Sequence, residues 1–333
     1  MFKFRLLVSA IALTGSMSVA AAEPLPSVAP APADNPTTLE KVTLGKMLYH
    51  DPRLSSTGTV SCASCHNTML GGEDNRAVAM GVNGQTGGRS APTVWNAAFN
   101  KVQFWDGRAD SLEAQAAGPV TNPIEMGMKS WDDVVARLKT IEGYQHAFEK
   151  AFGKDSISKE NATKAIAAYE RTLITPNSPY DKYLGGDKDA MTKQQIRGME
   201  KAVEVGCTSC HSGPAFNGPG MFQKFPVNSN GYFEAQYHFL KDKGLAEVTK
   251  KDSDEHMWKV PTLRNVALTA PYFHNGSVKT LDRAVWLMAK LQLNKELSDG
   301  DVADIVAFLN ALTGEFPTQT MPQLPATPGS TFN

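Results

Sequence analysis

The sequence has few of the features that mark nucleic-acid-binding or membrane-spanning proteins. Its 333 residues carry 33 Lys and Arg against 34 Asp and Glu, and no long basic block is present. Nucleic acid and anionic membrane surfaces are therefore poor partners. Beyond the first 22 residues, no apolar run approaches the roughly 20 residues that span a bilayer. Alternating patterns typical of strands are scarce, so we expect a mainly α-helical fold with long loops.

The N-terminus has the pattern of an export signal. Lys3 and Arg5 precede an apolar run that ends in the small residues Ala20 to Ala22. This order predicts a signal peptide over residues 1–22, cleaved after Ala22, and hence an exported protein. Residues 23–37 are rich in Pro and Ala and predict an extended linker.

Cysteine is rare, and its four positions form two copies of one motif, CASCH and CTSCH. In an oxidising compartment two disulfides are the simplest interpretation, and zinc ribbons also use paired C-x-x-C. Neither interpretation explains why a histidine follows each pair, whereas covalent c-type haem attachment requires this order. We therefore expect two c-type haems, held by Cys62, Cys65 and His66 and by Cys207, Cys210 and His211.

The chain repeats itself around these motifs. APTVWNAAF (91–99) resembles VPTLRNVAL (260–268), and FWDGRADSL (104–112) resembles FHNGSVKTL (273–281), both with an offset of 169. The repeat predicts two cytochrome c-like domains, at 38–176 and 188–315, followed by a C-terminal tail at 316–333. The second copy carries about two dozen extra residues, including 221–244, which we expect to form a loop.

Helical periodicity marks the beginning and the end of each repeat. Residues 38–51 and 192–206 precede the two cysteine motifs, and residues 158–174 and 298–312 close the two copies behind Ser or Asp cap signals. Helix, cysteine motif, loop and closing helix is the order of a small cytochrome c.

The two copies differ where a sixth iron ligand would lie. The offset of 169 aligns Met288 with Pro119, and proline cannot bind iron. A haem with both axial positions filled suits electron transfer, whereas an open position suits chemistry. The second haem therefore looks closed by Met288, with Met221 and Met257 as alternatives, and the first looks open. Glu125 follows Pro119 closely and would suit acid–base catalysis there.

Three segments together resemble a known family. Residues 51–67, 90–127 and 260–285 are similar to the signature segments of the bacterial dihaem cytochrome c peroxidases, a family that also contains the dihaem enzyme that matures methylamine dehydrogenase. The resemblance implies two cytochrome c-like domains and reduction of hydrogen peroxide to water. It assigns the proximal ligands to His66 and His211 and the sixth ligand of the electron-receiving haem to Met288.

The resemblance also implies the remaining site residues. It places Glu125 and Gln115 in the peroxide pocket and Trp105 between the haems. A calcium ion would bind the carbonyls of Thr269 and Pro271, with Ser90 at a position that is usually asparagine. Because calcium prefers six to eight oxygen ligands, this change weakens the expectation of calcium.

One departure from the family concerns activation. Typical members carry a histidine that caps the peroxidatic iron until the other haem is reduced, and Val82 occupies that position here. No histidine lies between His66 and His146. Met80, or His238 from the second copy, would be the alternative cap.

The sequence therefore predicts a periplasmic dihaem peroxidase that needs no reductive activation. Its electron donor would be a small cytochrome c or a cupredoxin, and a homodimer is compatible with the family. The first alternative is a peroxide-dependent oxidase of a partner protein or organic molecule. The methylamine dehydrogenase maturase is such an enzyme, but it uses a tyrosine where this chain has Met288. The second alternative is a non-catalytic electron carrier.

Overall fold

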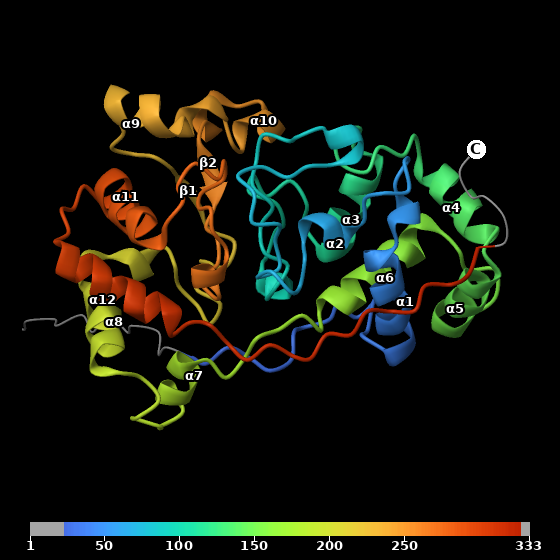
Figure 1. Cartoon of the computed structure of the whole chain (residues 1–333), viewed down its shortest axis with the longest axis horizontal. Helices are drawn as coiled ribbons and strands as arrows, with labels where there is room; N and C mark the ends of the chain where they lie inside the picture. The colour runs from blue at the N-terminus through green and yellow to red at the C-terminus, as the bar shows by residue number, and fades with distance from the viewer. Residues whose placement is uncertain (1–22, 328–333) are drawn as a thin grey trace, which may run out of the picture.

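The computed structural model describes residues 23–327, so the predicted signal peptide lies outside the described residues. Figure 1 shows two mainly helical halves side by side, with β1 and β2 between α11 and the loops of the other half. Within residues 23–327, no helix combines the length and apolar character that crossing a membrane requires.

The described residues contain twelve α-helices and two short strands, joined by loops and short 3₁₀ turns. The first half contains α1 (Leu39–His50), α2 (Cys62–Cys65), α3 (Leu112–Thr121), α4 (Trp131–Lys139), α5 (Glu142–Phe152) and α6 (Lys159–Glu170). The second contains α7 (Pro179–Leu184), α8 (Lys193–Val205), β1 (Phe222–Lys224), α9 (Gly231–Tyr237), α10 (Ala246–Thr249), β2 (Met257–Lys259), α11 (Leu281–Leu293) and α12 (Asp299–Asn310). The expectation of a mainly helical fold is confirmed.

Local capping explains where the predicted helices begin. The side chain of Ser158 accepts a hydrogen bond from the amide of Asn161 at the start of α6. Thr192 and Ser298 form capping boxes at the starts of α8 and α12. These caps satisfy backbone N–H groups that have no partner within the helix. All four helices that flank the cysteine motifs lie where the sequence predicts them.

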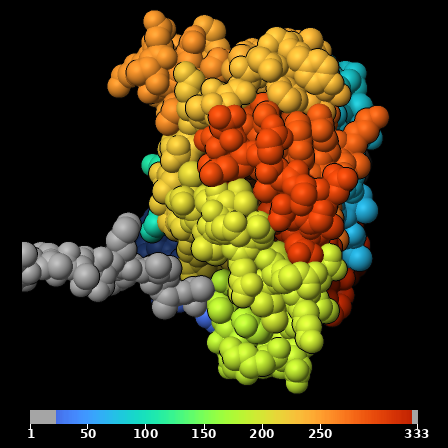
Figure 2. All heavy atoms as spheres, turned by 90° about the vertical axis from the view of Figure 1, so that its left-hand side faces the viewer, coloured from blue at the N-terminus to red at the C-terminus, as the bar shows by residue number. Residues whose placement is uncertain are grey.

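In each half, the helix that precedes the cysteine motif crosses the last helix at a glycine. A Cβ atom on Gly45 of α1 would lie 1.9 Å from the carbonyl oxygen of Ala165 in α6. A Cβ atom on Gly198 of α8 would lie 1.8 Å from the carbonyl oxygen of Asp304 in α12. Only glycine permits such close backbone contact, so both halves build their helix crossing in the same way. In Figure 2, α8 and α12 form part of the outer surface of the second half.

The cores follow this arrangement. A large cluster in the first half joins α1, α4, α5 and α6, and includes Leu48, Tyr144 and Ile166. The second half has one cluster around α8 and α12 and another, rich in aromatic rings, around α11 and β2. Each half therefore buries its own apolar surface.

The extra residues of the second half contain a strand and a helix, so the expectation that they form a loop is wrong. Residues 222–224 form β1, which pairs antiparallel with β2 in the register Phe222 to Lys259 and Lys224 to Met257. The same insertion contains α9, and Phe233 and Phe239 from it are buried in the aromatic cluster. The insertion thus contributes to the core of the second half.

Segments from both ends of the chain run along the two halves (Figure 1). The amide of Leu25 donates to Asp181 in α7 (3.0 Å), whereas Asn35 donates to Glu113 in the first half (2.6 Å). Asp181 also forms a buried ion pair with Arg264, whose side chain is 0% exposed. Near the other end, Phe316 packs edge-on against Trp95. Both segments therefore link the halves.

Candidate functional site

The first cysteine motif forms a short helix with its histidine at the C-terminal end. Cys62 and Cys65 bound α2, and His66 is its C-cap. The Nδ1 atom of His66 hydrogen bonds with the carbonyl oxygen of Pro92 (2.9 Å), and the Tyr49 hydroxyl donates to the backbone carbonyl of His66 (2.6 Å). Because the carbonyl fixes the proton on Nδ1, Nε2 remains a free metal ligand. Burial lowers the pKa of His66, which favours the neutral, ligating form.

The second motif repeats this geometry. Cys207 begins a 3₁₀ turn, and His211 hydrogen bonds through Nδ1 with the carbonyl of Pro261 (3.1 Å). Pro92 and Pro261 are 169 residues apart, the offset of the internal repeat. Burial also lowers the pKa of His211. Both histidines are therefore anchored through one ring nitrogen, as metal-ligating imidazoles usually are.

A cavity of about 820 Å³ lies beside the first motif. Its lining brings together Cys62, Cys65 and His66 with three other predicted site residues, Trp105, Gln115 and Glu125. Gln115 and Pro119 come from α3, and Glu125 comes from the turn that follows it. A cavity of this size falls within the range of small-molecule and cofactor sites.

The turn after α3 fixes Glu125. The Asn122 side chain donates to Oε1 of Glu125 (2.8 Å), and the amide of Glu125 donates to the carbonyl of Asn122 (3.1 Å). Burial raises the pKa of Glu125, although Arg108 and the Asn122 hydrogen bond oppose this shift. A carboxyl group with a raised pKa exchanges protons more readily near neutral pH.

Val82 holds this turn through a backbone hydrogen bond. Its amide donates to the carbonyl of Glu125 (2.8 Å), and its side chain is only 2% exposed. Its neighbour Gly81 lies so close to the turn that a Cβ atom would be 2.2 Å from the carbonyl oxygen of Ile124. Val82 is not among the residues that line the cavity, whereas Met80 and His238 are. The Sδ atom of Met80 accepts a hydrogen bond from Arg76 (3.3 Å).

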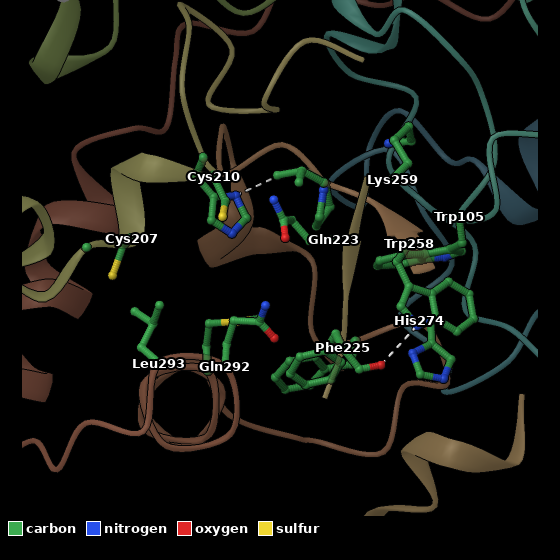
Figure 3. A pocket seen from close by; sticks show the side chains of 16 residues that line it. Trp105, Cys207, Cys210, Gln223, Phe225, Trp258, Lys259, His274, Gln292 and Leu293 are labelled. Carbon is green, nitrogen blue, oxygen red and sulfur yellow. Dashed lines mark hydrogen bonds between the residues drawn. The ribbon is translucent and has the colours of Figure 1, made fainter. Parts of the chain in front are cut away.

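A second cavity lies beside the second motif. Cys207, Cys210 and His211 line it together with Met288 from α11. Neither alternative ligand, Met221 nor Met257, is among its lining residues. Figure 3 shows Cys207 and Leu293 on one side of this cavity and Trp105, Trp258 and His274 on the other.

Trp105 and His274 stand between the two cavities, since both residues line each of them. Their rings meet edge to face, with centroids 6.5 Å apart, and His274 stacks on Trp258 at 4.1 Å. The indole of Trp105 donates to the carbonyl of Ser90 (2.9 Å). A line of aromatic rings therefore separates the two predicted haem sites.

The donor set fits two covalent haems. None of the four cysteines forms a disulfide, so both pairs can attach a haem. Each pair adjoins a buried histidine with one nitrogen anchored, and each motif lines a cavity. Among residues 23–327, no cluster of three or more His, Cys, Asp or Glu side chains has the arrangement of a metal site.

Comparison with known proteins also indicates two haems. Residues 39–189 match the family described as di-haem cytochrome c peroxidase. The cytochrome c551 peroxidase of Nitrosomonas europaea is 42% identical over 308 residues, which cover 92% of this chain and 89% of that relative. The chain belongs to the di-haem cytochrome c peroxidase family. It is an oxidoreductase of the cytochrome c peroxidase class, with two haems as cofactors and peroxide as its substrate.

Two further relatives support the family and the fold of this di-haem peroxidase. The cytochrome c peroxidase Ccp of Escherichia coli K12 is 48% identical over 289 residues, but these cover 87% of this chain and only 61% of that relative. A crystal structure described as a MauG-like protein associated with microbial copper homeostasis is 28% identical, with a TM-score of 0.76, over 91% of this chain and 96% of that one.

The predicted calcium ligands lie near the boundary between the halves. The amide of Ser90 donates to the carbonyl of His274 (2.7 Å), which brings Ser90 close to the segment that contains Thr269 and Pro271. The side chain of Asn75 donates to the carbonyl of Ala270 in the same segment (3.1 Å). A cation here would depend on backbone oxygens and water.

Sequence reasoning missed three residues of this di-haem peroxidase that line the first cavity: Arg108, Glu170 and His274. His274 aligns with Trp105 at the offset of 169, so the repeat contained a signal for it. Glu170 ends α6, and its Oε2 atom has no hydrogen-bond partner among the described residues. Burial raises the pKa of Glu170 to about 8, and nothing in the sequence distinguishes it from a solvated helix residue.

Proposed function

We propose that this chain is a periplasmic enzyme that reduces hydrogen peroxide to water at the haem held by His66, without prior reductive activation. Electrons would come from a small cytochrome c or a cupredoxin and enter at the haem held by His211. One observation carries the proposal: Glu125 and Gln115 share a cavity with His66, while Val82 is buried outside it.

The haems supply the redox chemistry, and the chain supplies the proton chemistry. Glu125 would accept a proton from the inner peroxide oxygen and return it to the outer oxygen, which favours heterolytic cleavage of the O–O bond. The side-chain amide of Asn122 keeps the Glu125 carboxylate in one orientation. Gln115 lines the same cavity and would hold the peroxide by hydrogen bonding.

The second haem would act as the electron acceptor. Met288 is the methionine that shares a cavity with His211, which favours it over Met221 and Met257 as sixth ligand. A thioether ligand raises the haem potential. Trp105 lines both cavities, which supports its proposed role in carrying electrons between the haems.

The proposal of an open first haem rests on Val82. An isopropyl group offers no lone pair to iron, and the buried position of Val82 supports the Glu125 turn instead. Met80 and His238 line the cavity and are the residues that would restore a cap. The Sδ atom of Met80 already accepts a hydrogen bond from Arg76, which disfavours Met80.

The main alternative is oxidation of a partner protein or organic molecule by the same peroxide-reactive haem. The likeness to a MauG-like structure motivates it. A non-catalytic electron carrier would not need a carboxyl and an amide in the cavity beside His66. Calcium bound near Ser90, Thr269 and Pro271, and a homodimer, remain predictions.

Steady-state turnover of the holoenzyme tests the proposal. Reduced cytochrome c or reduced cupredoxin is mixed with peroxide, and both donor oxidation and peroxide loss are measured. We expect catalytic turnover in which two one-electron donors are oxidised per peroxide. Peroxide consumption that oxidises neither donor would favour the partner oxidase. No peroxide consumption at all would favour the electron carrier.

A further inference from the structure

One buried amine faces the second cavity without a counter-charge. Lys259 ends β2, is 9% exposed and lines the second cavity (Figure 3). His211 and Met288 line the same cavity. The sixteen lining residues include no Asp or Glu, and Lys259 is the only Lys or Arg among them. Within residues 23–327, its Nζ atom forms no ion pair or hydrogen bond.

An unpaired ammonium in such surroundings is costly. Burial lowers the pKa of Lys259 to about 8, because the charged form loses its hydration. Buried charges in proteins are normally paired or hydrogen-bonded. The lining offers Lys259 no anion, so a matching anion must come from the group that fills the cavity.

We propose that Lys259 binds a propionate carboxylate of the haem attached to Cys207 and Cys210, and that its charge raises the potential of this haem. The haem is the only constituent of this site that brings carboxylates. The amide of Lys259 donates to the carbonyl of Trp105 (3.0 Å), so the ion pair would lie beside the proposed electron route. The proposal deepens the proposed function by giving the electron-receiving haem a second determinant besides Met288.

The internal repeat shows that the first half has no charge at the position that corresponds to Lys259. At the offset of 169, Lys259 corresponds to Ser90. The backbones match, since the amide of Ser90 donates to the carbonyl of His274 as the amide of Lys259 donates to that of Trp105. Only the side chains differ, so the equivalent position at the first haem carries no charge.

The arginines near the first haem do not replace this missing cation. Arg89 pairs with Asp106 and Asp242, and Arg108 also pairs with Asp106. Their charges are therefore partly neutralised by the protein. The Lys259 charge would be neutralised only by the cofactor. A cation beside a haem stabilises the form that has gained an electron, so its effect adds to that of Met288.

The test is a spectroelectrochemical titration of both haems in the holoprotein. We expect Lys259→Met to lower the potential of the second haem by at least 59 mV, a tenfold change in a one-electron equilibrium. Lys259→Arg should keep the potential near that of the wild type. The matched control is Lys224→Met, since Lys224 is an exposed lysine on the paired strand β1. The first haem should change little in every variant.

An unchanged second-haem potential in Lys259→Met would overturn the proposal, as would a shift of the same size in Lys224→Met. If a variant loses the second haem, its potential cannot be titrated, and haem content measured by intact mass is the readout instead. Loss in Lys259→Met and Lys259→Gln but not in Lys259→Arg supports the ion pair, and equal loss in all three contradicts it. The titration needs no peroxide, so its result is independent of whether the enzyme turns over peroxide.

Discussion

Replacing Glu125 with glutamine removes the proposed proton carrier while keeping the size of the side chain. The carbonyl oxygen of the introduced amide could still accept the hydrogen bond from Asn122 that now holds Oε1 at 2.8 Å. Loss of an acid–base group typically slows a reaction by 10²–10⁴, which is about 3–5 kcal/mol of activation free energy. We therefore expect kcat/KM for peroxide in Glu125→Gln to fall by that factor, with both haems still attached.

The pH profile gives this prediction a second readout. Burial raises the pKa of Glu125. As the pH falls, its carboxylate therefore becomes protonated at a higher pH than the carboxylate of an ordinary glutamate does. The ionised form accepts the peroxide proton, and kcat/KM of the wild type should fall on the acid side through that raised pKa. Glu125→Gln should lack this acid limb, whereas Glu149→Gln, at an exposed position on α5, should keep it. Near-wild-type kcat/KM with the acid limb intact in Glu125→Gln would refute the role of Glu125.

Three further predictions concern the haems and the fold. Cys62→Ala and Cys207→Ala should each prevent stable attachment of one haem, and intact mass should show two covalent haems in the wild type; bare polypeptide would contradict the site. Met288→Leu should lower the potential of the second haem and change its spin state, because the thioether favours ferrous iron; an unchanged titration would exclude Met288 as the ligand. Asp181→Ala should cost about 3–5 kcal/mol in the free energy of unfolding, because it leaves the 0%-exposed arginine partner unpaired. Denaturant titration measures this cost, and a loss no larger than the roughly 0–1 kcal/mol expected at the exposed pair of Asp304 would contradict it.

The helices were predictable because their signals are local. The side chains of Ser158, Thr192 and Ser298 each accept a hydrogen bond from the backbone amide three residues further along, at the start of a helix. The insertion was not predictable in the same way. β1 gains its partner from β2, more than thirty residues further along the chain, so nothing within residues 221–244 indicates a strand.

The site residues that belong to the internal repeat or to the haem motifs could be predicted from the sequence. The repeat aligns Trp105 with His274 and Ser90 with Lys259, but an alignment does not reveal that these positions meet across the boundary between the halves. The structure supplies that contact, since backbone hydrogen bonds join Ser90 to His274 and Lys259 to Trp105. Whether a charged side chain lacks a partner is likewise visible only in three dimensions, as at Lys259.

The open first haem is the central claim, and electron paramagnetic resonance of the fully oxidised holoenzyme tests it most directly. Because Val82 is buried behind the Glu125 turn and offers no ligand atom, we predict one high-spin ferric signal together with one low-spin signal. The same oxidised sample should react with peroxide without prior reduction. Two low-spin signals, and no reaction with peroxide until the second haem is reduced, would show that Met80, His238 or another residue caps the first haem and would contradict the claim.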